Sequence, residues 1–301
     1  MKTSNSRFQI SDFKFCLRAV LALCAAAVLS GCNANGSLNT DAIGNAFGGA
    51  TGSLIKAGGH VAKAAALDEK DEPAMGQSVG VVLTSTYGVY QDDTLLTYVT
   101  LVGLTVASAS PNPGGNYVFG ILDTDEVNAF SGPDGYIFIT RGALQQMKDE
   151  AELAGVLAHE VAHVCHHDGL HQAQAAELQA AAVNGVDAAA QNNDTVAQLS
   201  QGINAGIDAI TKTGYTQPQE FDADADGVKF MTAAGYDPHS YLNFLTRLWQ
   251  IHAASAGLKI MATHPGIDQR VAKVQAEIAQ MNNPGGATLA DRFAANVQFP
   301  K

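Results

Sequence analysis

Apolar residues recur at helical spacing through most of the second half of the chain. Over residues 150–165 they return every three or four positions, which is the period of a helix that buries one face. Asp149 and Glu152 stand at the start of this stretch in the spacing of a capping box, which indicates a helix N-terminus. Further helices are predicted over residues 219–234, 238–254 and 267–281, the second of which has Pro238 at its first position.

Two strands are predicted ahead of these helices. They cover residues 117–122 and 136–140, which are rich in β-branched and aromatic side chains, and residues 131–135 between them are turn formers. Residues 127–130 are a candidate for a third, short strand. Local propensity also favours a strand over residues 79–86. Short strands followed by a run of helices indicate an α+β fold.

The first 31 residues have a different pattern. A basic head and the apolar run 19–29 precede Leu29-Ser30-Gly31-Cys32, which is the arrangement of a secretory signal. The apolar run is shorter than the about 20 residues that a membrane-spanning helix needs. The ending resembles a bacterial lipobox, which implies cleavage before Cys32 and lipidation of this residue. The alternative is an ordinary signal with an incidental cysteine.

Composition and charge narrow the classes of partner. The chain is 47% hydrophobic and only 15% charged, which excludes a disordered polyelectrolyte. Its formal net charge is −12; removal of residues 1–31 leaves 13 basic and 28 acidic residues and a net charge of −15. Such an acidic chain binds phosphate backbones poorly, so no nucleic-acid partner is expected.

The candidate chemistry centres on His159-Glu160-Val161-Ala162-His163. Histidines four residues apart lie on one face of a helix and can present two imidazole nitrogens to one metal ion. Glu160 sits beside that ion, where a carboxylate can accept a proton from water. Glu220 is available as a third ligand, 57 residues beyond His163, and Asp224 follows it by one helical turn.

These residues resemble the gluzincin zinc metallopeptidases, in the group of the HtpX, Oma-type and CAAX-prenyl-protease enzymes. That group carries His-Glu-x-x-His followed by Glu-x-x-Ala-Asp, and Glu220-x-x-Ala223-Asp224 matches the second motif. The resemblance implies one zinc ion held by His159, His163 and Glu220, with Glu160 as general base. It also implies that Asp224 orients a ligand histidine.

The resemblance extends over about residues 76–279 and implies a mostly helical peptidase domain in which a small β-sheet forms one wall of the active-site cleft. It favours a helix over a strand at residues 79–86. It also implies that Asn128-Ala129-Phe130 lie on the edge strand that binds an extended substrate. The predicted division of the chain is a signal peptide (1–31), a Gly/Ala-rich tether (32–75), the zinc metallopeptidase domain (76–283) and a loose tail (284–301).

Two residues near the end of the domain have more than one interpretation. His264 and Arg270 are candidate catalytic residues that stabilise the oxyanion formed when water attacks a peptide carbonyl. Alternatively, His264 belongs to a turn before a helix and Arg270 is a structural ion-pair partner. In a third interpretation His264 caps the open position of the zinc and keeps the enzyme latent.

Other histidines and acids near the motifs have simpler interpretations. His166, His167 and His171 are expected to be polar residues where the helix emerges, since one helix cannot point all its histidines at a single ion. Residues 222–227 resemble the start of a calcium-binding loop, but Ala233 replaces the glutamate that such a loop needs at its twelfth position. A calcium site is therefore excluded here.

The function expected from these features is a membrane-anchored zinc endopeptidase that cleaves unfolded or misassembled envelope proteins. Its partners would be polypeptide substrates and a lipid bilayer, contacted through lipidated Cys32. Asn33 stands where aspartate would signal retention at the inner membrane, which favours the outer membrane, facing the periplasm. The alternatives are a catalytically idle zinc lipoprotein that acts as a chaperone or scaffold, and a solute-binding lipoprotein without metal. The sequence carries no signal for an oligomeric state.

Overall fold

Helix α7 (Glu150–Cys165) is the element around which the others pack, and its residues from Glu150 to His163 are all buried. The computed structural model describes residues 67–184, 207–255, 263–282 and 284–299, which belong to one compact unit. Asp149 caps the helix as predicted, because its side chain accepts a hydrogen bond from the Glu152 nitrogen at 2.8 Å. The Glu152 carboxylate in turn accepts from the Lys148 nitrogen.

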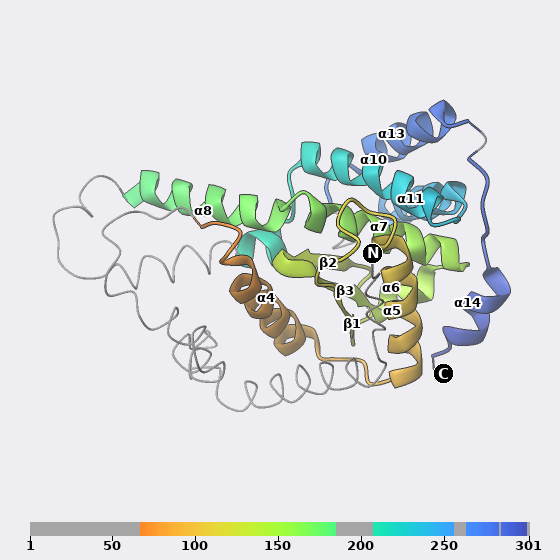
Figure 1. Cartoon of the computed structure of the whole chain (residues 1–301), viewed down its shortest axis with the longest axis horizontal. Helices are drawn as coiled ribbons and strands as arrows, with labels where there is room; N and C mark the ends of the chain where they lie inside the picture. Colours follow the sequence, from red (N-terminus) through yellow and green to blue (C-terminus); the bar gives the residue numbers. More distant parts are fainter. Residues whose placement is uncertain (1–66, 185–206, 256–262, 283, 300–301) are drawn as a thin grey trace, which may run out of the picture. The chain divides into compact units, whose positions relative to one another are not determined.

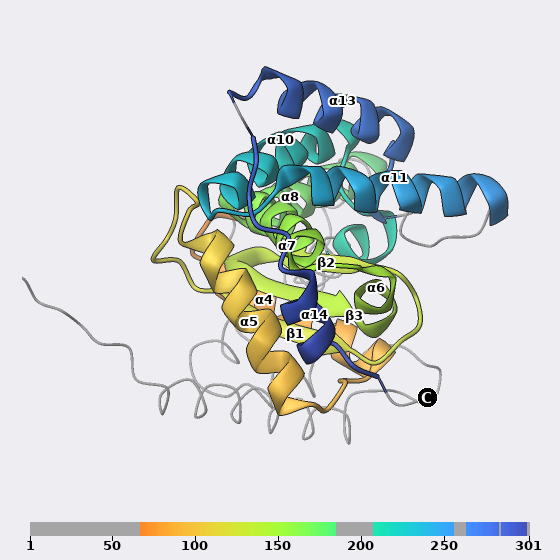
Figure 2. The ribbon, with the colours of Figure 1, turned by 90° about the vertical axis from the view of Figure 1, so that its right-hand side faces the viewer.

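Helix α7 lies between two groups of elements (Figures 1 and 2). One group is helical and comprises α10 (Gln217–Ala233), α11 (Pro238–Ser255) and α13 (Ile267–Gln280). The other comprises the β-sheet with α4 (Glu72–Tyr87) and α5 (Asp93–Ala107). The remaining helical elements are the 3₁₀ turn η1 (Pro133–Gly135), α6 (Arg141–Gln146), α8 (Asp168–Asn184), the π-helical turn η3 (Ala209–Thr213) and α14 (Ala290–Asn296).

The sheet has three strands, β1 (Val118–Leu122), β2 (Ala129–Gly132) and β3 (Tyr136–Thr140), in the order β1-β3-β2. Strand β1 runs parallel to β3, and β2 runs antiparallel to it with Phe130 opposite Phe138. Among the described residues, no strand pairs with the other edge of β2, which is called its free edge below. The turn between β2 and β3 needs Gly135, whose φ is +77° and whose position leaves no room for a Cβ beside the Asn116 carbonyl.

Small residues allow the neighbouring helices to approach α7 closely. A Cβ built at Gly227 on α10 would lie only 3.0 Å from the His159 backbone nitrogen. A Cβ at Gly155 on α7 itself would lie 2.6 Å from the side chain of Tyr241 on α11. The short distance between α7 and α10 brings His159 and His163 on α7 within reach of Glu220 and Asp224 on α10.

Most elements lie where the sequence predicts them. The mostly helical α+β fold is confirmed, and β1, β3, α10, α11 and α13 begin within two residues of their predicted positions. Residues 79–86 are helical, as the family resemblance implies and against their β propensity. Strand β2 starts at Ala129, two residues later than predicted. Asn128 lies just before the strand, although its carbonyl accepts a hydrogen bond from the Thr140 nitrogen.

The C-terminal segment differs from its prediction as a loose tail. Residues 284–299 include helix α14, in which the Phe293 side chain is only 5% exposed. The neighbouring Arg292 forms an ion pair with Glu150, a buried carboxylate at the start of α7. Glu150 also accepts hydrogen bonds from Tyr98 at 2.9 Å and Tyr236 at 2.7 Å. A short helix that carries one aromatic anchor and one arginine paired with a buried carboxylate is too brief for hydrophobic periodicity to detect.

The N-terminal boundary also differs slightly. Helix α4 begins at Glu72, so the ordered fold starts before residue 76 and includes the end of the predicted tether. The predicted signal peptide, with Cys32, and the tether up to residue 66 lie outside the described residues.

We predict that Arg292→Ala lowers the free energy of unfolding by about 1–2 kcal/mol at pH 7, because it removes a partner of the buried Glu150 carboxylate; the loss is smaller than for a fully buried pair, since Arg292 itself is 54% exposed and screened by solvent. Burial raises the pKa of Glu150, but the hydrogen bonds from Arg292, Tyr236 and Tyr98 outweigh it and hold the pKa below its ordinary value. A lowered carboxyl pKa stabilises the fold above the ordinary value, and the effect is lost as the pH falls. The difference between variant and wild type should therefore shrink below about pH 4.

Urea unfolding at pH 7 and pH 3.5 measures this difference. Arg141→Ala is the matched control, since Arg141 pairs with the exposed Asp123 and Asp125, and surface pairs contribute at most about 1 kcal/mol. Equal losses for the two variants, or a loss for Arg292→Ala that does not change with pH, would contradict the role of Glu150.

Candidate metal centre and active site

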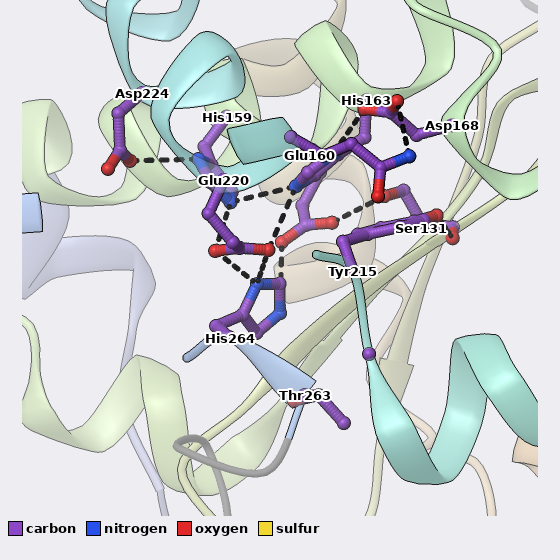
Figure 3. A network of polar contacts seen from close by, with 12 residues as sticks. Ser131, His159, Glu160, His163, Asp168, Tyr215, Glu220, Asp224, Thr263 and His264 are labelled. Carbon is purple, nitrogen blue, oxygen red and sulfur yellow. Dashed lines mark hydrogen bonds and ion pairs between the residues drawn. The ribbon is translucent and has the colours of Figure 1, made fainter. Parts of the chain in front are cut away.

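The two histidines of the motif lie one turn apart on α7 with their Nε2 atoms 3.1 Å apart (Figure 3). Glu220 on α10 faces both, with carboxylate oxygens 3.4 Å from His163 Nε2 and 3.6 Å from His159 Nε2. His264, just before α13, places its Nδ1 3.1 Å from Glu220. These four side chains, which form the metal-binding group, are buried, and each offers a ligand atom within 4.8 Å of the others. The structure thus gathers the three predicted ligands and adds His264.

Carboxylates hold the other ring nitrogen of both α7 histidines. Asp224 Oδ1 lies 3.0 Å from His159 Nδ1, and Asp168 Oδ2 lies 2.8 Å from His163 Nδ1. If these Nδ1 atoms carry the protons, as their acidic partners require, each Nε2 lone pair is free for a metal ion. The contact of Asp224 agrees with the expectation that it orients a ligand histidine. The sequence reasoning missed Asp168, although an acidic residue five positions beyond His163 was a visible signal.

Arg270 on α13 joins the two carboxylates of α10. Its NH1 lies 2.7 Å from Glu220, and its Nε and NH2 donate to both oxygens of Asp224 at 2.8 and 2.7 Å. The side chain is 3% exposed, and Tyr241 also accepts from NH2. The donors of Arg270 are thus engaged by Glu220, Asp224 and Tyr241, and the side chain also lines the cavity beside His159 and Glu160.

The charges around the cluster set its protonation. Burial raises the pKa of Glu220, but the charges of His264 and Arg270 outweigh it and hold the pKa well below its ordinary value. Burial lowers the pKa of His163, yet the hydrogen bonds to Asp168 and Glu220 raise it to about 9 in the absence of metal. A metal ion must therefore displace a proton from this cluster, which favours a strongly binding cation.

Glu160 lies on α7 next to this cluster and is 1% exposed. Its Oε2 accepts a hydrogen bond from Ser131 Oγ at 2.6 Å, and its Oε1 lies 3.8 Å from His264 Nε2 (Figure 3). The two carboxylate oxygens thus have different surroundings, one held by β2 and the other on the side of the metal-binding group. No sequence pattern predicts the hydrogen bond between Ser131 and Glu160.

The free edge of β2 passes beside the cluster. The carbonyl of Asn128, just before β2, accepts a hydrogen bond from Thr140 of β3. Because successive carbonyls along a strand point in opposite directions, the Ala129 and Ser131 carbonyls point to the free edge. The Ala129 carbonyl lies 3.1 Å from His264 Nε2, and Asn128 Oδ1 accepts from Thr263 Oγ1 at 3.2 Å.

The Phe130 side chain points away into a hydrophobic cluster with Val79 and Leu83. Of the three residues assigned to substrate binding, Asn128 and Ala129 thus reach the site.

Tyr215, which sequence reasoning also missed, closes the opposite end of this edge. Its ring stacks on His163 with centroids 4.0 Å apart, and its hydroxyl donates to the Ser131 carbonyl at 2.7 Å. Tyr215 precedes the N-cap of α10, so its position follows from the start of that helix.

A cavity opens beside His159 and Glu160. Its walls are mostly apolar and include Val156, Phe244, Leu245, Leu248 and Ile267, and Ala129 and His264 also line it. A dry wall of this kind strengthens electrostatic interactions in the adjacent site.

The remaining candidate residues lie apart from the cluster. Helix α7 ends at Cys165, and His167, with a φ of +54°, pairs with Glu72 instead. His166 pairs with Asp226 on α10 at 2.9 Å. These contacts agree with their prediction as polar residues of the helix end.

The donor set fits zinc. Imidazole nitrogens with one carboxylate are the ligands that catalytic zinc sites use, whereas calcium and magnesium prefer oxygen ligands alone. The carboxylate partners of both Nδ1 atoms and the buried, preformed arrangement are what such a site requires. The residues present thus suit one zinc ion per chain.

Comparison with known proteins supports this interpretation. Residues 97–278 match the model of peptidase family M48. The chain is 29% identical over 249 residues to the beta-barrel assembly-enhancing protease of Escherichia coli K12, an alignment that covers 74% of this chain and 50% of that protein. It is 29% identical over 215 residues to the mitochondrial metalloendopeptidase OMA1 of Schizosaccharomyces pombe, covering 68% of this chain and 60% of that protein.

A protease HtpX homolog of Salinibacter ruber is 25% identical over 182 residues, which cover 52% of this chain and 66% of that protein. The chain spans about half the length of the assembly-enhancing proteases that it matches. The family match covers more than half of the chain and includes His159, His163, Glu220 and His264, the four side chains of the buried metal-binding group. The chain therefore belongs to peptidase family M48, a family of zinc metallopeptidases.

Proposed function

We propose that this protein is a zinc-dependent endopeptidase in which His159, His163 and Glu220 hold the zinc and Glu160 is the general base. The observation that carries the proposal is the buried group of metal-binding side chains with a further carboxylate directly beside it. A structural zinc site is closed by its ligands and needs no such carboxylate. The M48 membership and the named proteases among the relatives support the same activity.

The residues of the chain divide the chemistry between them. A zinc ion bound here supplies Lewis-acid chemistry, which polarises the scissile carbonyl and lowers the pKa of a water molecule. Glu160 takes the proton of the attacking water and passes it to the leaving amine. Asp224 and Asp168 orient the two histidines, and Arg270 keeps Glu220 and Asp224 ionised and in place.

The substrate proposed is an extended segment of an unfolded or misassembled polypeptide. Strand β2 has a free edge beside Glu160, and an extended chain can pair with such an edge as an additional strand. Its outward carbonyls, at Ala129 and Ser131, are already occupied by His264 and Tyr215. An incoming strand therefore has to displace at least His264.

The proposed location is the bacterial envelope, with lipidated Cys32 as the anchor to the membrane, and the outer membrane is preferred to the inner. The lipobox-like segment 29–32 and the similarity to an assembly-enhancing protease support this proposal. Among the residues that the structure describes, none of the helices is both long and apolar enough to span a bilayer.

The first prediction for the active site concerns the general base. Glu160→Gln should lower kcat for casein cleavage by at least about 1,000-fold, within the range that general-base catalysis contributes, and leave the zinc content at one per chain. Glu277→Gln, on α13 away from the cluster, is the control and should stay active. Zinc-loaded wild type that cleaves no faster than Glu160→Gln would instead support the idle scaffold.

The second prediction concerns Asp168. Asp168→Ala should weaken zinc binding by about 10- to 100-fold, because loss of a carboxylate that orients a ligand histidine has this effect in other zinc sites. Competition with a chelator at pH 7 and at pH 9 measures it, since the proton on His163, whose pKa is about 9 without metal, competes less with zinc at the higher pH. Asp226→Ala, which removes one of the two carboxylate partners of His166 but none of His163, is the matched control. Equal zinc affinities for both variants would contradict the assignment.

The third prediction separates the interpretations of His264. If His264 blocks the site, as its contacts with Glu220 and the Ala129 carbonyl suggest, His264→Ala should cleave casein severalfold faster than wild type. If His264 stabilises the oxyanion, the same variant should be slower. Initial rates at equal zinc occupancy decide between the two.

A further inference from the structure

Ser131 connects the substrate-binding edge to the residue proposed as the general base. It lies in β2 and is 1% exposed. Because side chains alternate along a strand, Ser131 faces α7 while its neighbour Phe130 faces the hydrophobic cluster with α4. Its hydroxyl donates to Glu160 Oε2 at 2.6 Å, a short hydrogen bond of the charge-assisted kind.

We propose that Ser131 is a positioning residue for Glu160, and the proposal rests on the function proposed above. A glutamate side chain has three rotatable bonds, and the proton transfer needs one carboxylate oxygen at a fixed place. Ser131 fixes Oε2, which leaves Oε1 on the side of the metal-binding group, 3.8 Å from His264 Nε2. The hydroxyl thereby determines which oxygen accepts the proton of the attacking water.

Tyr215 makes this arrangement rigid. It donates to the Ser131 carbonyl at 2.7 Å and stacks on His163, the ligand that lies one turn beyond Glu160 on the same helix. Ser131 is therefore connected to α7 directly, through the hydrogen bond of its hydroxyl to Glu160, and indirectly, through its carbonyl and the Tyr215 ring that stacks on His163. Ser131 also lies on the strand edge that an extended substrate approaches, two residues from the Ala129 carbonyl that His264 occupies.

The hydrogen bond between Ser131 and Glu160 could have one of two roles, to satisfy a buried carboxylate or to position a general base, and the two roles lead to different results when the bond is removed. Loss of a structural bond lowers stability and leaves kcat per folded, zinc-loaded molecule unchanged. Loss of a positioning bond lowers kcat, with KM and zinc content retained. A misplacement of the order of 1 Å in a reacting group costs up to about 100-fold in rate.

The test compares Ser131→Ala, Ser131→Thr and Ser240→Ala in the full-length, zinc-loaded protein. Ser240 is the matched control, a buried serine that donates to the Asp149 carboxylate at 3.1 Å away from the metal-binding group. Ser131→Ala should lower kcat for a peptide substrate about 10-fold or more, with KM changed less than twofold and one zinc per chain. Ser131→Thr, which keeps the hydroxyl, should recover most of kcat, and Ser240→Ala should keep it.

A second measurement does not depend on activity. In the metal-free protein, Ser131→Ala should change the unfolding equilibrium constant by about tenfold in the presence of Glu160 and much less in a Glu160→Ala background. Wild-type kcat in Ser131→Ala, or the absence of this coupling, would overturn the positioning role while the peptidase itself stands. Failure of the proposed function looks different, because wild type would then cleave no faster than Glu160→Gln.

Discussion

The buried ion pairs of Arg270 with Glu220 and Asp224 are the interactions on which the site depends. All three side chains are at most 3% exposed, and a carboxylate removed from water is stable only with a close counter-charge and full hydrogen bonding. Each carboxylate also faces a histidine of α7. Arg270 on α13 thus allows α10 to present two negative groups to α7, and the three helices are fixed relative to one another by the same contacts.

This constraint explains why the helices pack so tightly. Gly227 lets α10 approach the backbone of α7 at His159, and a larger residue there would move Glu220 and Asp224 away from their histidines. The energy that keeps these charges together comes from the apolar packing around α7, most of whose side chains are completely buried. The site is accordingly built on the best-packed elements of the fold, which suits a centre that needs fixed geometry.

Much of this can be predicted from sequence because local patterns carry it. The period of apolar residues locates α7, α10 and α13, and the spacing of His159, His163 and Glu220 indicates the metal-binding group. Ser131 and Tyr215 escape detection because their roles arise from tertiary contacts, and serine and tyrosine are common at turns and strands. Asp168 could have been found, since it lies only five residues beyond His163. Helix α14 escapes because Arg292 and Phe293 act through single long-range contacts rather than through a periodic pattern.

The central claim is that one zinc ion binds between α7 and α10. The most direct test is a crystal structure of the zinc-loaded protein with anomalous data collected at the zinc absorption edge. The account predicts one strong peak, about 2.0–2.2 Å from His159 Nε2, His163 Nε2 and a Glu220 oxygen. A zinc peak elsewhere with this group empty, or no bound zinc at all, would contradict it.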